Sequence, residues 1–170
     1  YKRQRHYIDK KVEKSLLDEM LSAANLAPSW KNSQTPRFYV ATGEKSKNAV
    51  REALPEFNRK NSENASAYIV TTVVLNRSGF DKDGTAVTEI GNGWGYYDLG
   101  LNNMALLLKA TELGLSTLVM GIRYGEKLRK EFDIPETEAV VSVIAVGYTD
   151  SEIVRPKRKS VEDFAKFYED

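Results

Sequence analysis

Two clusters of basic residues, one near each end of the chain, carry the side chains best suited to hold an anion. They occupy 2–5 (KRQR) and 155–159 (RPKRK). In a chain with 25 Lys and Arg, 24 Asp and Glu and a net charge of +1, such clusters are ordinarily solvated surface. If the fold brings the two ends together, they form a clamp suited to a phosphate, because Arg presents paired donors. The sequence leaves both possibilities open.

A polar loop at 28–34 (PSWKNSQ) is the second candidate for binding chemistry. The amides of Asn32 and Gln34 each offer a donor and an acceptor. Spaced two residues apart before a strand, they could read the alternating donors and acceptors of a planar heterocycle. The alternative is an ordinary helix–loop–strand connection whose side chains bond their own backbone.

The remaining inventory excludes most catalytic machinery. The chain has no Cys and one His, which excludes disulfides, thiol nucleophiles, iron–sulfur clusters and sites built from Cys or several His. No loop gathers Asp and Glu at the spacing of a calcium site, so we expect no metal. His6 lies in a basic patch, and no serine stands in a nucleophile elbow. If the protein is an enzyme, we expect a bound group to carry the difficult chemistry.

Residues 91–95 (GNGWG) superficially match a dinucleotide-binding fingerprint. That fingerprint needs its third glycine one position later and an apolar strand directly before it. Tyr96 occupies the glycine position, and 85–90 is a poor strand. We therefore interpret 76–95 as a variable, glycine-rich loop, of a length typical of functional lids or mobile segments.

Hydrophobic patterning predicts one domain over 1–170, with a central sheet and helices on both faces. The strands 67–75 and 138–147 are β-branched and apolar almost throughout, which is typical of interior strands. The helix 96–113 is apolar on most sides and is expected to be central and buried. The other helices are expected at 14–26, 44–54, 125–132 and from about 160, and the other strands at 37–41 and 116–120.

Neither composition nor patterning suggests nucleic acid or a membrane as a partner. The net charge is close to zero, and apolar stretches such as 139–146 are far shorter than the roughly 20 residues that span a bilayer. Residues 1–5 are basic but lack the apolar core of a signal peptide. We expect a cytoplasmic protein, and because the chain begins at Tyr1 we expect residues before it.

The chain resembles the FMN-dependent nitroreductases through a series of blocks that follow in that family's order. The most specific is APSxxNxQ at 27–34. The others are Arg5-x-Tyr7, Asp98-x-Gly100, Leu113-Gly114-Leu115, Val146-Gly147-Tyr148 and Pro156-Lys157-Arg158-Lys159-Ser160. Together the blocks cover most of the chain.

The resemblance implies an α+β fold with a nitroreductase-like central mixed sheet and helices on both faces. It also implies a homodimer with FMN at the subunit interface and tails that wrap around the partner. By this resemblance Arg3, Arg5, Lys157 and Arg158 hold the FMN phosphate. Arg5 is the firmest N-terminal match, since Arg3 stands where the family typically has Ser. The flavin and its ribityl chain are expected to contact Ser29, Asn32 and Gln34, with the backbone at Gly121 against the reactive edge.

The activity implied is an oxidoreductase that takes hydride from NAD(P)H and reduces a small organic acceptor such as a nitroaromatic or quinone. The flavin carries the chemistry, so no catalytic side chain is expected. Trp94, Tyr96 and Tyr124 are candidates for the acceptor pocket, although dimer or core packing would also use such rings. Ene reduction, dehalogenation and oxygen-dependent flavin breakdown on the same fold stay open. So do a non-catalytic flavin-binding protein and an interaction domain without flavin.

Overall fold

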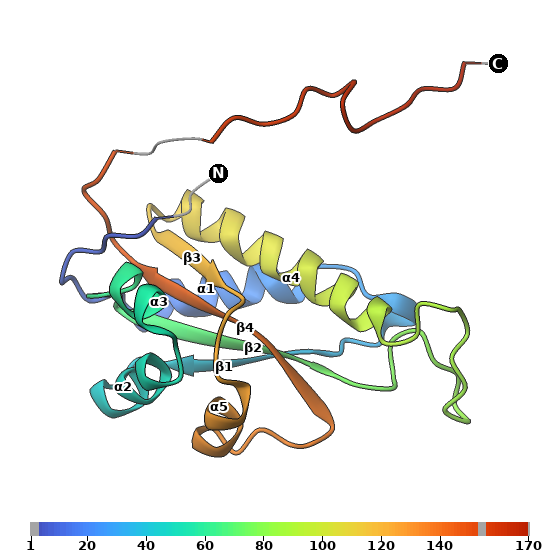
Figure 1. Cartoon of the computed structure of the whole chain (residues 1–170), viewed down its shortest axis with the longest axis horizontal. Coiled ribbons are helices and arrows are strands. Elements are labelled where there is room, and N and C mark those ends of the chain that lie inside the picture. The colour runs from blue at the N-terminus through green and yellow to red at the C-terminus, as the bar shows by residue number, and fades with distance from the viewer. Residues whose placement is uncertain (1–3, 153–155, 170) are drawn as a thin grey trace.

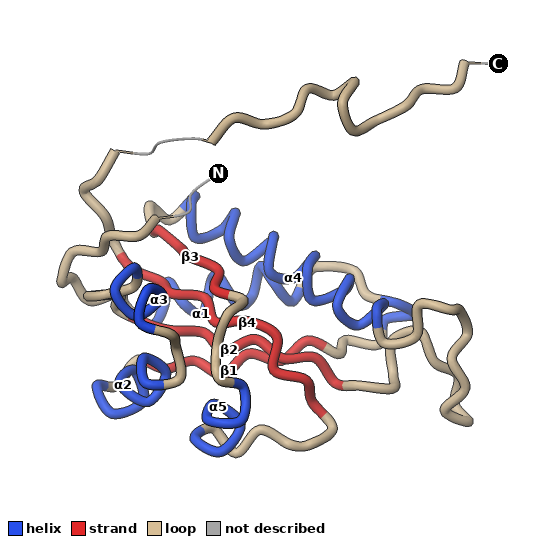
Figure 2. The backbone as a smooth tube through the Cα atoms, viewed as in Figure 1, coloured by secondary structure: helices blue, strands red, loops and turns tan. Residues whose placement is uncertain are grey.

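A four-stranded sheet lies between two layers of helices in the computed structural model, which describes residues 4–152 and 156–169 (Figures 1 and 2). The strand order is β1-β2-β4-β3. The strands are β1 (Pro36–Ala41), β2 (Ala67–Val74), β3 (Ser116–Met120) and β4 (Glu138–Gly147). The helices are α1 (Lys14–Asn25), α2 (Glu44–Glu52), α3 (Glu56–Asn61), α4 (Gly93–Glu112) and α5 (Gly125–Glu131), with a short 3-10 turn at Trp30–Asn32.

Successive side chains of the sheet enter two separate cores, one on each face. Ile69 of β2 packs with Met20 of α1 and Leu106 of α4. Its neighbours Tyr68 and Val70 instead join the core beneath α2 and α5. Because strand side chains alternate between faces, an interior strand covered on both sides must be apolar at nearly every position. The burial of β2 and β4 along almost their whole lengths confirms the two interior strands.

The α+β class and the helices on both faces are confirmed, but the described strands do not form a mixed sheet. β1 pairs with β2, β2 with β4 and β4 with β3, and each pairing is antiparallel. Patterning could not have shown this, since a strand buried on both faces is apolar whichever way its neighbours run.

The long helix α4 is buried on one face only, which corrects the expectation of a helix buried all round. Leu99, Leu106 and Ala110 are buried, whereas Tyr97, Met104 and Leu108 are 60%, 54% and 59% exposed. Exposed positions spaced by seven and four residues lie on one side of a helix. An apolar face of α4 is therefore uncovered in the single chain.

Two stretches differ most from the predicted elements, one directly after α2 and one at the C-terminal end. The charged stretch after α2 forms the short helix α3, which was not predicted. The helix predicted from about residue 160 is absent from the described tail, where 162–164 form a turn. Short helices depend on packing an apolar face, and the tail's Phe164 and Phe167 are exposed. Figure 1 shows the tail running away from the body.

None of the helices in the described ranges is both long enough and apolar enough to cross a bilayer.

Candidate functional site

The polar loop between α1 and β1 holds an unusual backbone. Lys31, Asn32 and Gln34 have φ angles of 45°, 54° and 49°, which place them in the left-handed region. That region costs a residue with a Cβ about 1–2 kcal/mol. Such conformations persist only where surrounding contacts enforce them, and they cluster at functional sites. The loop that the sequence singled out is thus a tightly shaped turn rather than a simple connection.

Asp98 of α4 supplies much of that enforcement. Its carboxylate is 2% exposed and accepts the backbone N–H of Trp30 at 3.1 Å and 3.2 Å to its two oxygens. The hydroxyls of Ser33 and Ser78 donate to Oδ2 at 3.5 Å and 2.5 Å. Within the loop, the N–H of Gln34 donates to Oγ of Ser29 at 3.0 Å. Asp98 was not predicted as a site residue, and its place in the Asp98-x-Gly100 block was the only signal.

Three of the predicted flavin contacts lie together in this loop. Asn32 and Gln34 are exposed and Ser29 is half-buried. Ser29 and Gln34 line a cavity of about 130 Å³ together with Arg37 and Asn102. The side chains that could contact a planar heterocycle therefore face solvent on one rim of the molecule.

The aromatic residues predicted for the acceptor pocket lie in two places. The ring centroid of Trp94 lies 4.6 Å from that of Trp30 and 5.8 Å from that of Tyr97. Trp94 therefore packs beside the polar loop. Tyr96 is 44% exposed on the same end of α4. Tyr124 precedes α5 and donates its backbone N–H to the carbonyl of Ala53, on the α2 and α5 side of the sheet. Trp94 and Tyr124 of one chain therefore do not share a pocket.

A second group of predicted contacts follows the edge strand β3. The N–H of Gln4 donates to the carbonyl of Thr117 at 3.2 Å, which places Arg5 near the start of the strand. Gly121 directly follows its end, where a Cβ would meet nothing within 4 Å. Gly121 lies four residues beyond Thr117, which is ~13 Å along the strand. Arg3 lies outside the described residues.

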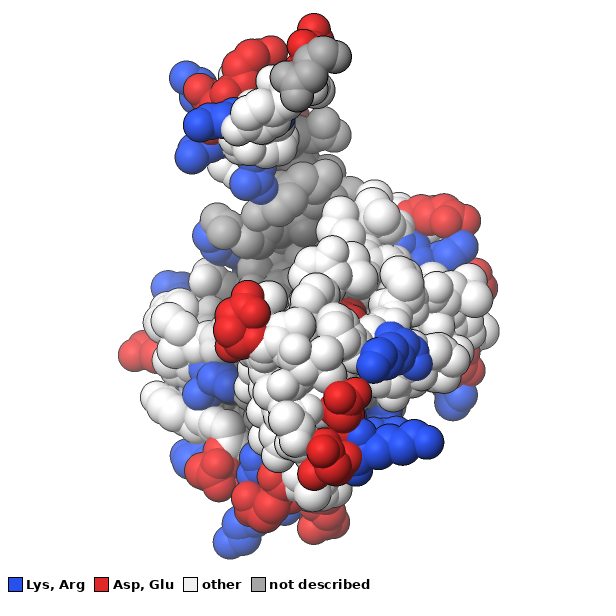
Figure 3. All heavy atoms as spheres, turned by 90° about the vertical axis from the view of Figure 1, so that its right-hand side faces the viewer, with Lys and Arg blue, Asp and Glu red and all other residues white. Residues whose placement is uncertain are grey.

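The C-terminal basic residues do not join this edge within the single chain. Lys157 and Arg158 are exposed in the extended tail. Figure 3 shows the tail's charged side chains standing clear of the body. The clamp predicted between the two ends is therefore not assembled within one copy of the described chain.

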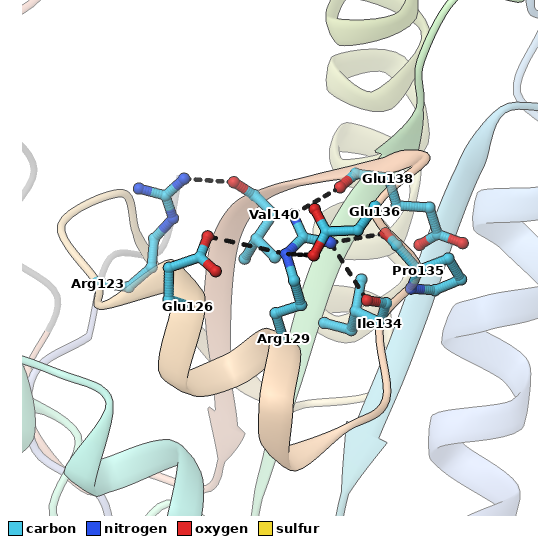
Figure 4. Close-up of polar contacts among 8 residues, drawn as sticks. All are labelled: Arg123, Glu126, Arg129, Ile134, Pro135, Glu136, Glu138 and Val140. Atoms are coloured by element: carbon cyan, nitrogen blue, oxygen red, sulfur yellow. Dashed lines mark hydrogen bonds and ion pairs between the residues drawn. The ribbon is translucent and has the colours of Figure 1, made fainter.

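The backbone after Gly121 is fixed by two arginines (Figure 4). Arg123 donates to the carbonyls of Gly121 and Val140. Arg129 of α5 donates to the carbonyl of Glu138 at 2.9 Å, and it forms ion pairs at 3.8 Å with Glu126 and Glu136. These bonds attach the connection between β3 and α5 to the start of β4.

Glu138 completes this network as a second buried carboxylate. It is 6% exposed and accepts hydroxyl hydrogen bonds from Tyr39, at 2.9 Å, and from Thr72. Desolvation, followed by the hydrogen bond to Glu138, raises the pKa of Tyr39 to about 12. The side chains that donate to this carboxylate belong to neighbouring strands, so the carboxylate stabilises the sheet.

The donor set fits a flavin mononucleotide better than it fits a metal. The loop offers amide and hydroxyl groups, and the buried Nε1 of Trp30 has no hydrogen-bond partner among the described residues. Gly121 leaves open space beside the backbone, and Arg5 supplies positive charge. Across the described ranges, no three His, Cys, Asp or Glu residues are grouped so that they could hold a metal ion.

Comparison with the sequence models of known families identifies the family of the chain. The sequence model of the nitroreductase family matches residues 3–148. The chain is a member of the nitroreductase family. Membership supports an oxidoreductase as the class of activity. No curated protein matches the sequence.

Solved structures share the fold at low sequence identity. An enone reductase of gut-bacterial fatty acid saturation superposes with a TM-score of 0.84 at 19% identity, covering 98% of this chain and 93% of its own. A Parabacteroides distasonis protein described as an NADH dehydrogenase/NAD(P)H nitroreductase gives 0.76 at 24%, covering 97% and 92%. An oxidoreductase containing FMN gives 0.76 at 24%, covering 88% and 73%. These similarities establish the nitroreductase fold for the chain.

Proposed function

We propose that the protein is an FMN-dependent oxidoreductase that takes hydride from NAD(P)H and reduces a small organic acceptor such as a nitroaromatic or quinone. The observation that carries the proposal is the strained turn at 29–34, which presents Asn32 and Gln34 to solvent in a chain of the nitroreductase family. Solved structures with this fold include one described as containing FMN and one described as an NAD(P)H nitroreductase.

The geometry of one chain favours a site built from two copies. The turn at 29–34 precedes β1, whereas Arg5 and Gly121 flank β3. β1 and β3 are the opposite edges of the sheet, separated by three strand spacings or ~14 Å. In a homodimer, the edge of one protomer and the turn of its partner can face the same ligand. Such a dimer could also bring together Trp94 and Tyr124 from different copies.

The exposed face of α4 is the surface we assign to this dimer. Tyr97, Leu101, Met104 and Leu108 recur at intervals of four, three and four residues, which forms a continuous stripe along one side of a helix. Three of the four are more than half exposed. Burying this stripe against a second copy removes apolar area from water, which is the main favourable term in association.

The proposed roles of the residues follow from their chemistry. Arg5, Lys157 and Arg158, with Arg3, supply the charges that hold the phosphate. Ser29, Asn32 and Gln34 orient the ring and the ribityl chain through hydrogen bonds, and Gly121 permits close approach of the backbone to the ring. When bound, FMN supplies the hydride chemistry, so no side chain is required as nucleophile or base. Trp94, Tyr96 and Tyr124 would form the walls around the acceptor.

The colour of the purified protein tests the proposal directly. We expect the flavin absorption of FMN to remain after incubation and desalting, and to bleach under anaerobic conditions when NADH or NADPH is added separately. Protein that stays colourless would contradict the flavin assignment. Protein that retains FMN but does not bleach would instead be a flavin-binding protein without turnover.

The acceptor class is tested on the reduced protein. A nitroaromatic, a quinone and an enone are added in turn to the bleached protein, and reoxidation is followed by absorbance. Fastest reoxidation by the enone would favour ene reduction, the activity described for one protein of the same fold.

Replacing Arg158 tests the phosphate assignment. We expect Arg158→Ala to weaken FMN binding by about tenfold or more, because it removes a hydrogen-bond donor to a charged group. Weaker dimerisation should accompany the loss, since the tail would cross to the partner. FMN occupancy is measured by absorbance after gel filtration, and Lys166→Ala in the same tail is the control. Unchanged occupancy in Arg158→Ala would remove this residue from the site.

A further inference from the structure

Asp98 of α4 contacts two other segments, one 20 residues and one 65 to 68 residues earlier in the sequence. It projects from α4, accepts hydrogen bonds from Trp30 and Ser33 of the 29–34 turn, and accepts another from Ser78. Ser78 belongs to the glycine-rich loop, which spans 76–92 rather than the predicted 76–95 because α4 already begins at Gly93. The ends of this 76–92 segment are joined by hydrogen bonds between Asn76 and Asn92. One carboxylate therefore contacts both the proposed flavin-facing turn and the segment next to it.

Only neutral donors compensate for the burial of this carboxylate. No Lys, Arg or His of the described ranges forms an ion pair with Asp98, although its side chain is almost completely buried. A buried charge without a counter-charge depends on the hydrogen bonds it accepts. The carboxylate therefore fixes where the Trp30 N–H and the Ser78 hydroxyl lie.

The 29–34 turn and the 76–92 segment are also connected by contacts that do not involve Asp98. Gly79, with a φ of +84°, approaches Trp94 so closely that a Cβ there would lie 2.6 Å from the indole ring. Trp94 in turn packs against Trp30 of the turn. At the surface, Lys31 pairs with Asp81 at 3.5 Å. Asp98 is thus the buried end of a continuous contact between the two segments.

We infer that Asp98 is a positioning residue that latches the strained 29–34 turn to the 76–92 segment, so that both keep one relative arrangement. Its effect on flavin binding rests on the proposed function, whereas its effect on the turn does not. The amide of Asn at this position has one acceptor oxygen instead of two. The Trp30 N–H donates to both carboxylate oxygens, so in Asp98→Asn it faces the NH2 group of the amide in either orientation, and a donor–donor contact replaces one of its two hydrogen bonds.

The two tryptophans of the chain give a readout that needs no cofactor. Both belong to the Trp30–Trp94 pair, so the near-ultraviolet circular dichroism of the flavin-free protein reports on the turn and the segment. We expect Asp98→Asn to lose most of the tryptophan bands and Ser78→Ala to lose part of them. Glu138→Gln is the matched control: it alters the other buried carboxylate and should leave the bands unchanged while lowering the melting temperature.

A second measurement follows the ligand. We expect the dissociation constant of FMN, read from flavin fluorescence, to rise at least about tenfold in Asp98→Asn, the size expected for lost hydrogen bonds to a charged group. Ser78→Ala should raise KM for the acceptor more than it lowers kcat. Glu138→Gln should leave the dissociation constant of FMN, KM and kcat unchanged.

The outcomes separate the two proposals. If the native protein does not bind FMN, the proposed function fails, and the tryptophan bands still test Asp98. If the bands and FMN affinity of Asp98→Asn match those of the native protein, the latch is overturned. If Asp98→Asn does not fold, Ser78→Ala decides, because it removes one hydroxyl and leaves the carboxylate. Native bands and a native KM in Ser78→Ala would then overturn the latch.

Discussion

Asp98 and Glu138, the two buried carboxylates of the described chain, lie on opposite faces of the sheet and hold different kinds of structure. Glu138 accepts the hydroxyls of Tyr39 and Thr72, which belong to β1 and β2. Asp98 accepts groups from an irregular turn and from a glycine-rich segment. A buried carboxylate thus accepts hydrogen bonds from regular strands on one face of the sheet and from strained backbone on the other.

The difference separates contacts that stabilise the fold from contacts that shape a site. The strands around Glu138 already have their backbone hydrogen bonds in the sheet, so this carboxylate adds stability to an arrangement that exists without it. No sheet ladder holds Lys31, Asn32 and Gln34 in left-handed conformations. The loss of Asp98 therefore allows the turn to relax locally, and its cost should appear in binding more than in unfolding.

The largest expected effect comes from the α4 face, on the same side of the sheet as Asp98. We expect Met104→Lys to convert the proposed dimer into a monomer and to release FMN, because it places a charge in the apolar stripe. Gel filtration with light scattering measures the mass. Phe57→Lys, at another exposed apolar residue on α3, is the control and should leave the mass unchanged. A dimer that persists in Met104→Lys would assign the interface to another surface.

A smaller effect is expected from the carboxylates themselves. Glu138→Ala should lower the free energy of unfolding by about 2 kcal/mol, because buried hydroxyls lose a charged acceptor. Asp98→Ala should lower it less, since relief of backbone strain in the turn offsets part of the loss. Urea denaturation followed by far-ultraviolet circular dichroism gives both values. A larger loss of stability in Asp98→Ala than in Glu138→Ala would contradict the distinction between a carboxylate that stabilises the sheet and one that shapes the turn.

The smallest effect is a pH dependence on the Glu138 side. The pKa of Tyr39 is raised from 10.0 to about 12, so the folded protein retains a proton that the unfolded chain releases first. The stabilisation is complete below pH 10 and is lost as the pH rises towards 12. The stability difference between the native protein and Tyr39→Phe should therefore shrink across this range. A constant difference, measured by urea denaturation at each pH, would contradict the hydrogen-bonded tyrosine.

Local patterns predicted most of the elements and pointed to the loop that forms the core of the candidate site. The strands at 116–120 and 138–147 have the predicted bounds, because an unbroken apolar run between turn residues is visible in the sequence. The block at 27–34 identified the turn that contains Ser29, Asn32 and Gln34. The predicted terminal helix at 160 was wrong, and the apolar side chains that it would bury, Phe164 and Phe167, are exposed in the described tail.

The sequence by itself determined the two apolar interior strands, the family blocks and the absence of cysteine chemistry, all of which are written in residue types and short spacings. Only the tertiary structure decided that the sheet is antiparallel, that one face of α4 is uncovered and that Asp98 holds the turn. The physical reason is separation along the chain. The hydrogen bond from Trp30 to Asp98 joins residues 68 positions apart, and no local periodicity encodes a contact of that range.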